Sequence, residues 1–197
     1  MSHTSRPQRQ RYDAFALTLH WITAASVIFL FASAHIWELL ARGTPLRKGL
    51  QSVHISCGIL LALVMIVRPL WRLYSQRQAR FAMPPAAGTR PTRILAHAMH
   101  GALYLLLFAQ IALGFLFRWA QQEPFSFFGL FDIPAWIAVD PSLRHQIGGW
   151  HDNVAWALII LACAHALAAL FHHYVLRDNV LRRMLLPARR SSSSQKG

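Results

Sequence analysis

The chain has few acidic residues, and charge of either sign is absent from long stretches of it. Only 7 of its 197 residues are Asp or Glu, whereas 20 are Lys or Arg. Four windows hold no charged residue at all: residues 14–37, 49–67, 94–117 and 153–176. A soluble helical protein of this size would interleave charges along each helix with a period of 3.6 residues. The missing charges therefore argue against a water-soluble protein and predict segments that cross a membrane.

The four uncharged windows have the length of membrane-spanning helices. They contain 24, 19, 24 and 24 residues, and about 20 apolar residues span the hydrocarbon core as a helix. We expect an all-α integral membrane protein, a four-helix bundle with helices at roughly 14–38, 49–73, 93–119 and 149–176. The bundle would form one membrane domain over residues 13–187. It would lie between an N-terminal tail, residues 1–12, and a disordered C-terminal tail, residues 188–197.

The basic residues are distributed unevenly between the two ends of this bundle. Fifteen of the twenty would lie on the side that holds both termini and the loop between the second and third windows, and five on the other side. Lys and Arg accumulate in cytoplasmic loops, so both termini are expected to be cytoplasmic. Because the positive charge follows the topology, it does not indicate nucleic-acid binding.

The chain is also poor in cysteine and in metal-site patterns. Its 2 cysteines, Cys57 and Cys163, fall inside predicted spans at opposite depths, so we expect free thiols in the core and no disulfide. The CxxC and HExxH patterns typical of zinc sites are missing. The spans contain no Asp, Glu or Lys, and the chain has no internal repeat, which disfavours a proton-coupled transporter.

Histidine, by contrast, is frequent inside the predicted spans. His151 and His165 lie fourteen residues apart in the last span, so they are about 21 Å apart along a helix and about 40° apart around it. One imidazole therefore lies on each side of a hydrocarbon layer about 30 Å thick. Ionisable residues inside a membrane are costly and point to function. The spacing predicts two haems in series across the membrane, each held by two histidines.

The opposing ligands are expected among the histidines of the other spans. On the outer side we favour His54 over His35, because Gly58, one turn beyond His54, lets a flat macrocycle approach the helix. His35 lies near a helix end, where a polar residue needs no special role. On the inner side, His20 and His100 are equally deep in their windows, and spacing alone leaves the choice between them open.

Another histidine continues the stripe of the last span. His172 lies seven residues beyond His165, which is about 10 Å further along the helix and about 20° from the same direction. An imidazole there can donate a hydrogen bond to a quinone carbonyl and titrates near neutral pH. We expect a quinone to bind at His172, with His97 and His100 as the next place. The alternative is an interfacial histidine, like its neighbour His173.

The outer loops carry a group of basic residues with few acids near them: Arg42, Arg47, Lys48 and Arg144. Such a collar would attract a small anion, superoxide or ascorbate, and raise its encounter rate in a salt-dependent manner. The same cations can instead pair with haem propionates and lipid headgroups. The apolar stretch 125–139 is too short to span, and we expect it to lie in the interface as a lid.

Several motifs are specific in combination: HISCG, WH followed fourteen residues later by H, and HHY with DN and LRRM. Together with LHWITAA and LAHAMHGALYLLL, they resemble the bacterial four-helix cytochrome b561 family over residues 12–187. The resemblance implies two b-type haems, with axial pairs His20–His165 on the inner side and His54–His151 on the outer side. It thereby favours His20 over His100.

The resemblance also implies a function. It points to an inner-membrane superoxide:ubiquinone oxidoreductase that oxidises superoxide at the periplasmic face and reduces ubiquinone. A related cytochrome b group gives the alternative, a membrane subunit that passes electrons between a dehydrogenase or hydrogenase partner and quinone. The chain length fits the four-helix group better, although His35 and Trp37 match no pattern of the family. Ligation by two histidines closes both axial positions, so the irons would transfer electrons without binding oxygen.

Overall fold

The computed structural model of the chain describes residues 13–77, 89–178 and 180–185. Its helices are α1 (Ala14–Glu38), α2 (Pro45–Arg77), α3 (Arg90–Ala120), the 3-10 helix η2 (Pro141–Leu143), α4 (Arg144–Tyr174) and α5 (Val180–Leu185). Helices α1 to α4 are each long and apolar enough to cross a membrane. The expected all-α class with four spans is therefore confirmed. The tails 1–12 and 188–197 lie outside the described residues.

The helix ends follow local chemistry. α1 begins after Asp13, whose carboxylate accepts a hydrogen bond from the Ala16 amide at 3.0 Å and so satisfies one of the free N–H groups of the first turn.

α2 runs to Arg77, beyond the expected end at residue 73, and contains Pro69. α5 was not anticipated. It returns to the start of the bundle, where the Trp21 indole donates a hydrogen bond to its backbone.

The loop between α3 and α4 contains a small β-hairpin that the sequence analysis did not anticipate. β1 (Ser126–Phe127) pairs antiparallel with β2 (Phe131–Asp132). Gly129, at φ 71°, lies in the turn, where glycine avoids the strain of a left-handed conformation. The fully buried Ser56 of α2 accepts a hydrogen bond from the Phe128 amide at 2.9 Å. The hairpin is therefore fixed to the first half of α2, at the end of the bundle opposite the start of α1.

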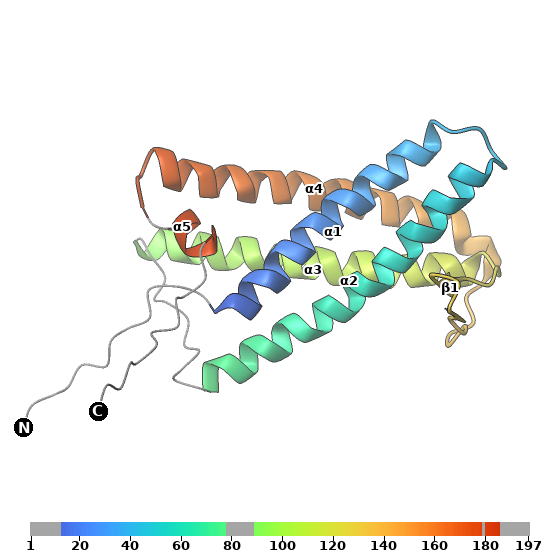
Figure 1. Cartoon of the computed structure of the whole chain (residues 1–197), viewed down its shortest axis with the longest axis horizontal. Coiled ribbons are helices and arrows are strands. Elements are labelled where there is room, and N and C mark those ends of the chain that lie inside the picture. Colours follow the sequence, from blue (N-terminus) through green and yellow to red (C-terminus); the bar gives the residue numbers. More distant parts are fainter. Residues whose placement is uncertain (1–12, 78–88, 179, 186–197) are drawn as a thin grey trace, which may run out of the picture.

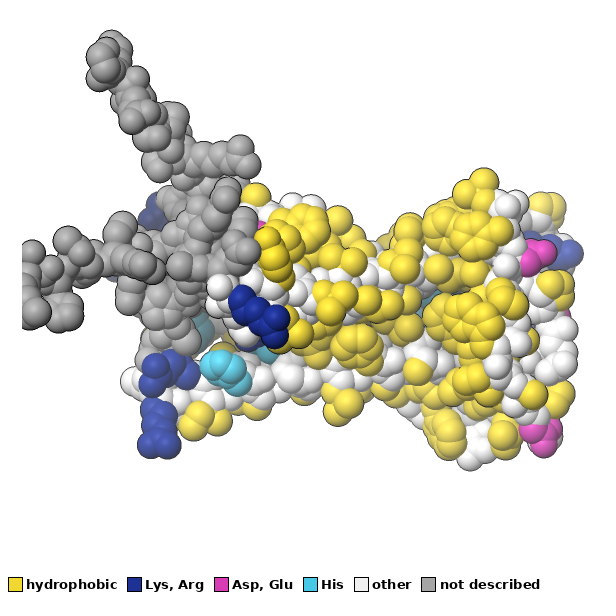
Figure 2. Space-filling model, turned by 90° about the horizontal axis from the view of Figure 1, so that it is seen from below, with side chains coloured by type: hydrophobic (Ala, Val, Ile, Leu, Met, Phe, Trp, Pro, Cys, Tyr) yellow, Lys and Arg dark blue, Asp and Glu magenta, His cyan; other side chains and the backbone are white. Residues whose placement is uncertain are grey.

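The four long helices form two antiparallel pairs. α1 packs mainly on α2, and α3 mainly on α4, and the two pairs cross each other (Figure 1). Apolar side chains cover the middle of the bundle, and cations gather at the end where α3 begins (Figure 2). This is the distribution expected of a bundle with its middle in hydrocarbon and its ends in water.

The buried core of the bundle lies midway between its ends. Its members come from three helices: Leu61 and Met65 of α2, Leu107 of α3 and Leu158 of α4. Leu61 follows His54 by seven residues, and Leu158 follows His151 by seven, which is about 10 Å along each helix. The core is thus an apolar layer that separates His54 and His151, at one end of the bundle, from the histidines at the other end.

Both cysteines are free, as expected. Cys57 is half-buried, but Cys163 is exposed on the surface of α4. The expectation that both thiols lie in the core is therefore wrong for Cys163. A thiol is small and apolar enough to face hydrocarbon without a partner.

Candidate functional site: two histidine layers

The candidate haem ligands lie in two layers, one on each side of the apolar core. We call His54 and His151 the outer layer, and His20 and His165 the inner layer. The structure brings both expected pairs together, since His54 lies within electrostatic range of His151 and His20 within range of His165. Each layer therefore combines one histidine of α4 with one histidine of the α1–α2 pair.

In the outer layer, hydrogen bonding fixes the tautomer of His54. Ser33 of α1 is 2% exposed, and its hydroxyl lies 3.0 Å from the Leu30 carbonyl and 3.0 Å from His54 Nδ1. The hydroxyl has one hydrogen, which it donates to the carbonyl, so it accepts the second bond from the Nδ1–H group. His54 Nε2 then carries a lone pair, which is the form of imidazole that binds a metal.

His151 is held on the opposite side of the outer layer by α3. Gln110 Nε2 lies 3.1 Å from His151 Nε2, and Gly114 faces the ring, with an added Cβ reaching 3.3 Å from His151 Cε1. His151 Nδ1 and Gln110 Oε1 are buried and have no partner among the residues described. Buried polar atoms without partners are costly, so the protein alone does not complete this layer.

Two glycines have open space beside them. A Cβ added at Gly58 of α2 or at Gly101 of α3 would meet no atom within 4 Å. Gly58 lies one turn beyond His54, as the sequence analysis required. Within the described residues, no three or more His, Cys, Asp and Glu side chains gather to hold a metal ion. Paired imidazoles beside open space fit haem ligation better than a zinc cluster.

In the inner layer, two histidines approach His165. His20 is half-buried and His100 is exposed. The His100 and His165 rings are 5.0 Å apart, nearly perpendicular, and His100 Nδ1 donates to the Ala96 carbonyl of its own helix at 2.6 Å. The structure therefore brings both candidates to His165. The greater burial of His20 favours it as the ligand.

His35 and His97 each bond to a carbonyl of their own helix. His35 Nδ1 bonds to the Phe31 carbonyl at 2.9 Å, and its ring lies 5.3 Å from that of Trp156. His97 Nδ1 bonds to the Arg93 carbonyl at 2.6 Å. Packing and a local hydrogen bond account for both side chains.

The inner layer contains a cation that the sequence analysis assigned only to topology. Arg68 follows His54 by fourteen residues on α2, as His165 follows His151 on α4. Its guanidinium carbon lies 5.3 Å above the centre of the Tyr104 ring. The spacing was the signal that could have placed Arg68 beside the inner histidines.

The expected quinone residue has a carboxylate partner. His172 Nδ1 lies 2.5 Å from Asp178 Oδ2, and the Asp178 amide donates to the His172 carbonyl at 3.1 Å. The chain reverses between them through Arg177, which adopts φ 51°. His173, by contrast, has a buried Nδ1 with no partner among the described residues. The Asp178 contact fixes the His172 ring and leaves Nε2 for a ligand.

The expected cationic collar is weaker than its residue list suggests. Arg47 donates to the carbonyls of Trp37 and Leu40 at 2.8 Å each, so it caps α1, whereas Arg42, Lys48 and Arg144 are exposed. Five of the seven acidic residues lie at this same end: Glu38, Glu123, Asp132, Asp140 and Asp152. Steering by these cations stays a prediction, and any positive collar is local.

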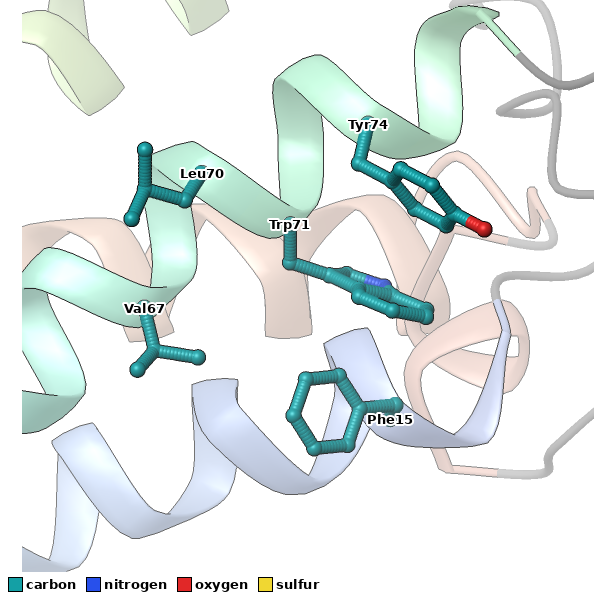
Figure 3. Close-up of a pocket in the computed structure, with 5 residues that line it drawn as sticks. All are labelled: Phe15, Val67, Leu70, Trp71 and Tyr74. Carbon is teal, nitrogen blue, oxygen red and sulfur yellow. The ribbon is translucent and has the colours of Figure 1, made fainter.

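An apolar groove of about 370 Å³ lies between α1 and α2 at the inner end (Figure 3). Its lining consists of Phe15, Val67, Leu70, Trp71 and Tyr74. The Trp71 indole points its N–H at the Asp13 carboxylate, 3.3 Å away. None of the candidate histidines lines this groove, so it belongs to the membrane-facing surface and to neither layer.

Comparison with known proteins covers nearly the whole chain. Residues 11–187 match the family model of prokaryotic cytochrome b561. The chain is 35% identical over 190 residues to cytochrome b561 homolog 2 of Escherichia coli K12, covering 94% of this chain and 95% of that protein. It is 30% identical to the probable superoxide oxidase CybB of Yersinia pestis, over 89% and 96% of the two chains. It is also 30% identical to cytochrome b562 of Cereibacter sphaeroides, over 91% and 98%. The residues matched by the family model, 11–187, include both histidine layers.

Proposed function

The chain belongs to the prokaryotic cytochrome b561 family, and we propose that it carries electrons from superoxide to ubiquinone through two haems, one in each histidine layer. Family membership makes it a multi-pass bacterial membrane protein that holds b-type haem and transfers electrons. Superoxide as the donor is supported by the name of one relative, a probable superoxide oxidase. The number of haems and the acceptor are part of the proposal.

The observation that carries the proposal is the pairing of histidines on both sides of one apolar core. His54 and His151 would bind the outer haem, and His20 and His165 the inner haem. When bound, such haems would supply one-electron transfer. The Ser33 hydroxyl orients His54 with its Nε2 lone pair available, which is the form of ligand that haem iron needs.

The reaction balances with simple reactants. Two superoxide anions each give up one electron and become dioxygen, and these two electrons with two protons convert ubiquinone to ubiquinol. Removing an electron from superoxide breaks no bond and needs no general base. The chain therefore has only to admit the anion to the outer layer and to supply protons at the quinone.

His172 is suited to the quinone end of this reaction. It lies about 10 Å beyond His165 along α4, and Asp178 holds its Nδ1. Its Nε2 can then exchange a proton or a hydrogen bond with a quinone carbonyl. The Asp178 carboxylate on Nδ1 fixes the orientation of the ring.

The orientation of the bundle decides which histidine layer faces the periplasm. We propose that both termini are cytoplasmic and that the loop between α3 and α4 is periplasmic, because fifteen of twenty basic residues lie at the end with the termini. An alkaline phosphatase fusion after Gly197 should be inactive, and one in the loop near Ala135 should be active. The reverse pattern would exchange the donor and acceptor ends.

Haem counting tests the ligand assignment. Pyridine haemochrome analysis of the purified protein should give two haems per chain. His54→Ala and His20→Ala should each leave one haem. The matched controls His35→Ala and His100→Ala, which alter a histidine at the same depth, should leave two. Two haems in His54→Ala, or one in His35→Ala, would contradict the outer pair.

One observation favours a second candidate, an electron-transfer subunit that serves a partner protein. The hairpin at the outer end exposes Phe128, Leu130 and Phe131, which are 46%, 75% and 56% exposed, and such a surface suits either a lipid interface or a protein partner. Purified protein that superoxide cannot reduce, but that a co-purifying dehydrogenase or hydrogenase reduces, would decide for this candidate.

A further inference from the structure

We propose that Arg68 gives a haem in the inner layer a higher reduction potential than one in the outer layer, so that electrons move inward. This inference rests on the proposed function, because it requires a haem in each layer. It assigns the direction of transfer to one side chain that is not itself a ligand. Arg68 is thus a residue that adjusts the potential through charge.

The position of Arg68 follows from helix geometry. α2 and α4 run in the same direction, and each carries a histidine in the outer layer. Fourteen residues further, about 21 Å along the axis, α4 has His165 and α2 has Arg68. Arg68 is half-buried over the Tyr104 ring and within electrostatic range of His20. A cation therefore lies at the depth of the inner haem.

Arg68 has no counter-ion on the described part of the chain. The ion pairs there are Arg118–Glu123 and His172–Asp178. Five of the seven acids lie at the outer end, Asp13 bonds to Ala16 and Trp71, and Asp178 to His172. A guanidinium inside a membrane without an anion is costly. The carboxylates of a bound haem would provide one.

The charges near the two layers have opposite sign. Arg68 remains protonated at any physiological pH, and its neighbour Arg72 is also basic. In the outer layer, the groups that hydrogen-bond to the histidines, Ser33 and Gln110, are neutral, and the charge that acts on His151 is the carboxylate of Asp152. An oxidised haem has one more positive charge than a reduced one. A cation therefore favours the reduced form at the inner layer, and a carboxylate favours the oxidised form at the outer layer.

Redox titration of the purified protein tests the inference. The wild type should titrate as two one-electron components, and the inner one is the component that remains in His54→Ala. In Arg68→Gln the equilibrium constant for reduction of that component should fall at least tenfold, which is 59 mV for one electron. The other component should change less. Arg68→Lys, which keeps the charge, should stay within threefold of the wild type.

Arg72→Gln is the matched control, because it removes a cation one turn away on the exposed surface of α2. It should change neither component by more than threefold. An Arg68→Gln protein with two haems and an unchanged inner component would overturn the inference. So would an equal fall in Arg68→Gln and Arg72→Gln. If Arg68→Gln does not retain two haems, Arg68→Lys decides, since a tenfold fall there would also overturn it.

The haem count separates this inference from the proposed function. One haem per chain in the wild type, or two haems in His165→Ala, would overturn the proposed function and with it the basis for the inference. Two haems in the wild type and one in His165→Ala would uphold the haem ligation on which the function rests. The potentials of the Arg68 variants then decide the inference alone.

Discussion

The outer and inner layers use the same type of side chain in different surroundings. The outer histidines contact neutral groups, the Ser33 hydroxyl and the Gln110 amide. Their end of the bundle has five acidic and five basic residues. The inner histidines lie beside Arg68, at an end with fifteen basic residues and two acidic ones. A repeated helical spacing can therefore supply two equivalent ligand pairs, while the neighbouring groups make the two sites different.

The repetition extends beyond the ligands themselves. On α3, His100 lies near His165, and fourteen residues further Gly114 faces His151. On α1, thirteen residues separate His20 from Ser33, which contacts His54. Every long helix thus contributes at least one residue at the depth of each layer. The apolar core between them keeps the two sites apart.

The largest effect should come from interrupting one layer at a time. His165→Ala should leave the outer haem reducible by superoxide but abolish superoxide-driven ubiquinone reduction, because the inner site is lost. His54→Ala should abolish reduction by superoxide but leave the inner haem reducible by ubiquinol. Stopped-flow spectra at the haem absorbance measure both reactions. Equal behaviour of the two variants with both donors would mean that the layers are not in series.

The next effect concerns the quinone at the inner end only. His172→Ala should keep both haems reducible but slow their reoxidation by ubiquinone at least about tenfold, since a positioned proton donor contributes more than that in related reactions. His173→Ala is the control and should change little. Asp178→Asn should fall between the two, because it keeps the contact but removes the charge. Unaltered reoxidation in His172→Ala would move the quinone towards His97 and His100.

The sequence was sufficient for the four spans and for the depth of the histidines. Charge-free length sets a span, and a fourteen-residue interval sets two depths whatever the tertiary packing. Spacing alone could not choose between His20 and His100, since both lie equally deep; the family resemblance favoured His20, and His20 is the more buried of the two. That difference depends on how the α1–α2 pair is rotated against α3 and α4, which periodicity does not encode.

Contacts between helices were the part that sequence reasoning missed. The Ser33 hydroxyl reaches His54 across twenty-one positions, and Ser56 fixes a hairpin more than seventy positions away. Serine in a span is common and small, so nothing in the local pattern marks it as a partner. Arg68 was visible as a charge at the end of a window, but its lack of a counter-ion is known only once the acids are placed.

A smaller effect should be confined to the outer layer. Ser33→Ala removes the acceptor for the His54 Nδ1–H group, so the outer haem should be retained about tenfold less tightly, as is usual when a ligand loses its hydrogen-bond partner. The inner haem should be unaffected. Ser33→Thr keeps the hydroxyl and should restore retention. Electron paramagnetic resonance should show a shift in the outer haem signal alone. A change in both signals would indicate general damage to the bundle.

The smallest effect should come from the exposed cations at the outer end. Removing one unit charge about 10 Å from the path of an anion in water changes its encounter rate about twofold, and salt at physiological concentration screens most of that. The collar is further limited because Arg47 is occupied with the end of α1 and five acids share this end. We therefore expect Arg42→Ala combined with Lys48→Ala to slow haem reduction by superoxide about two- to fourfold at low salt, and less at high salt.

The matched control for this last prediction is Arg90→Ala, an exposed cation at the inner end, which should leave the superoxide rate unchanged at every salt concentration. Pulse radiolysis with haem absorbance measures both variants. If the outer pair has no effect at low salt, steering by these cations is wrong, and their role is limited to lipid headgroups and helix ends. If Arg90→Ala slows the reaction as much, the encounter rate of superoxide depends on the net charge of the whole chain and not on a local collar. Only a difference in superoxide rate between the outer pair and Arg90→Ala would show that superoxide reacts at the outer end. This evidence would not depend on the haem-ligand variants.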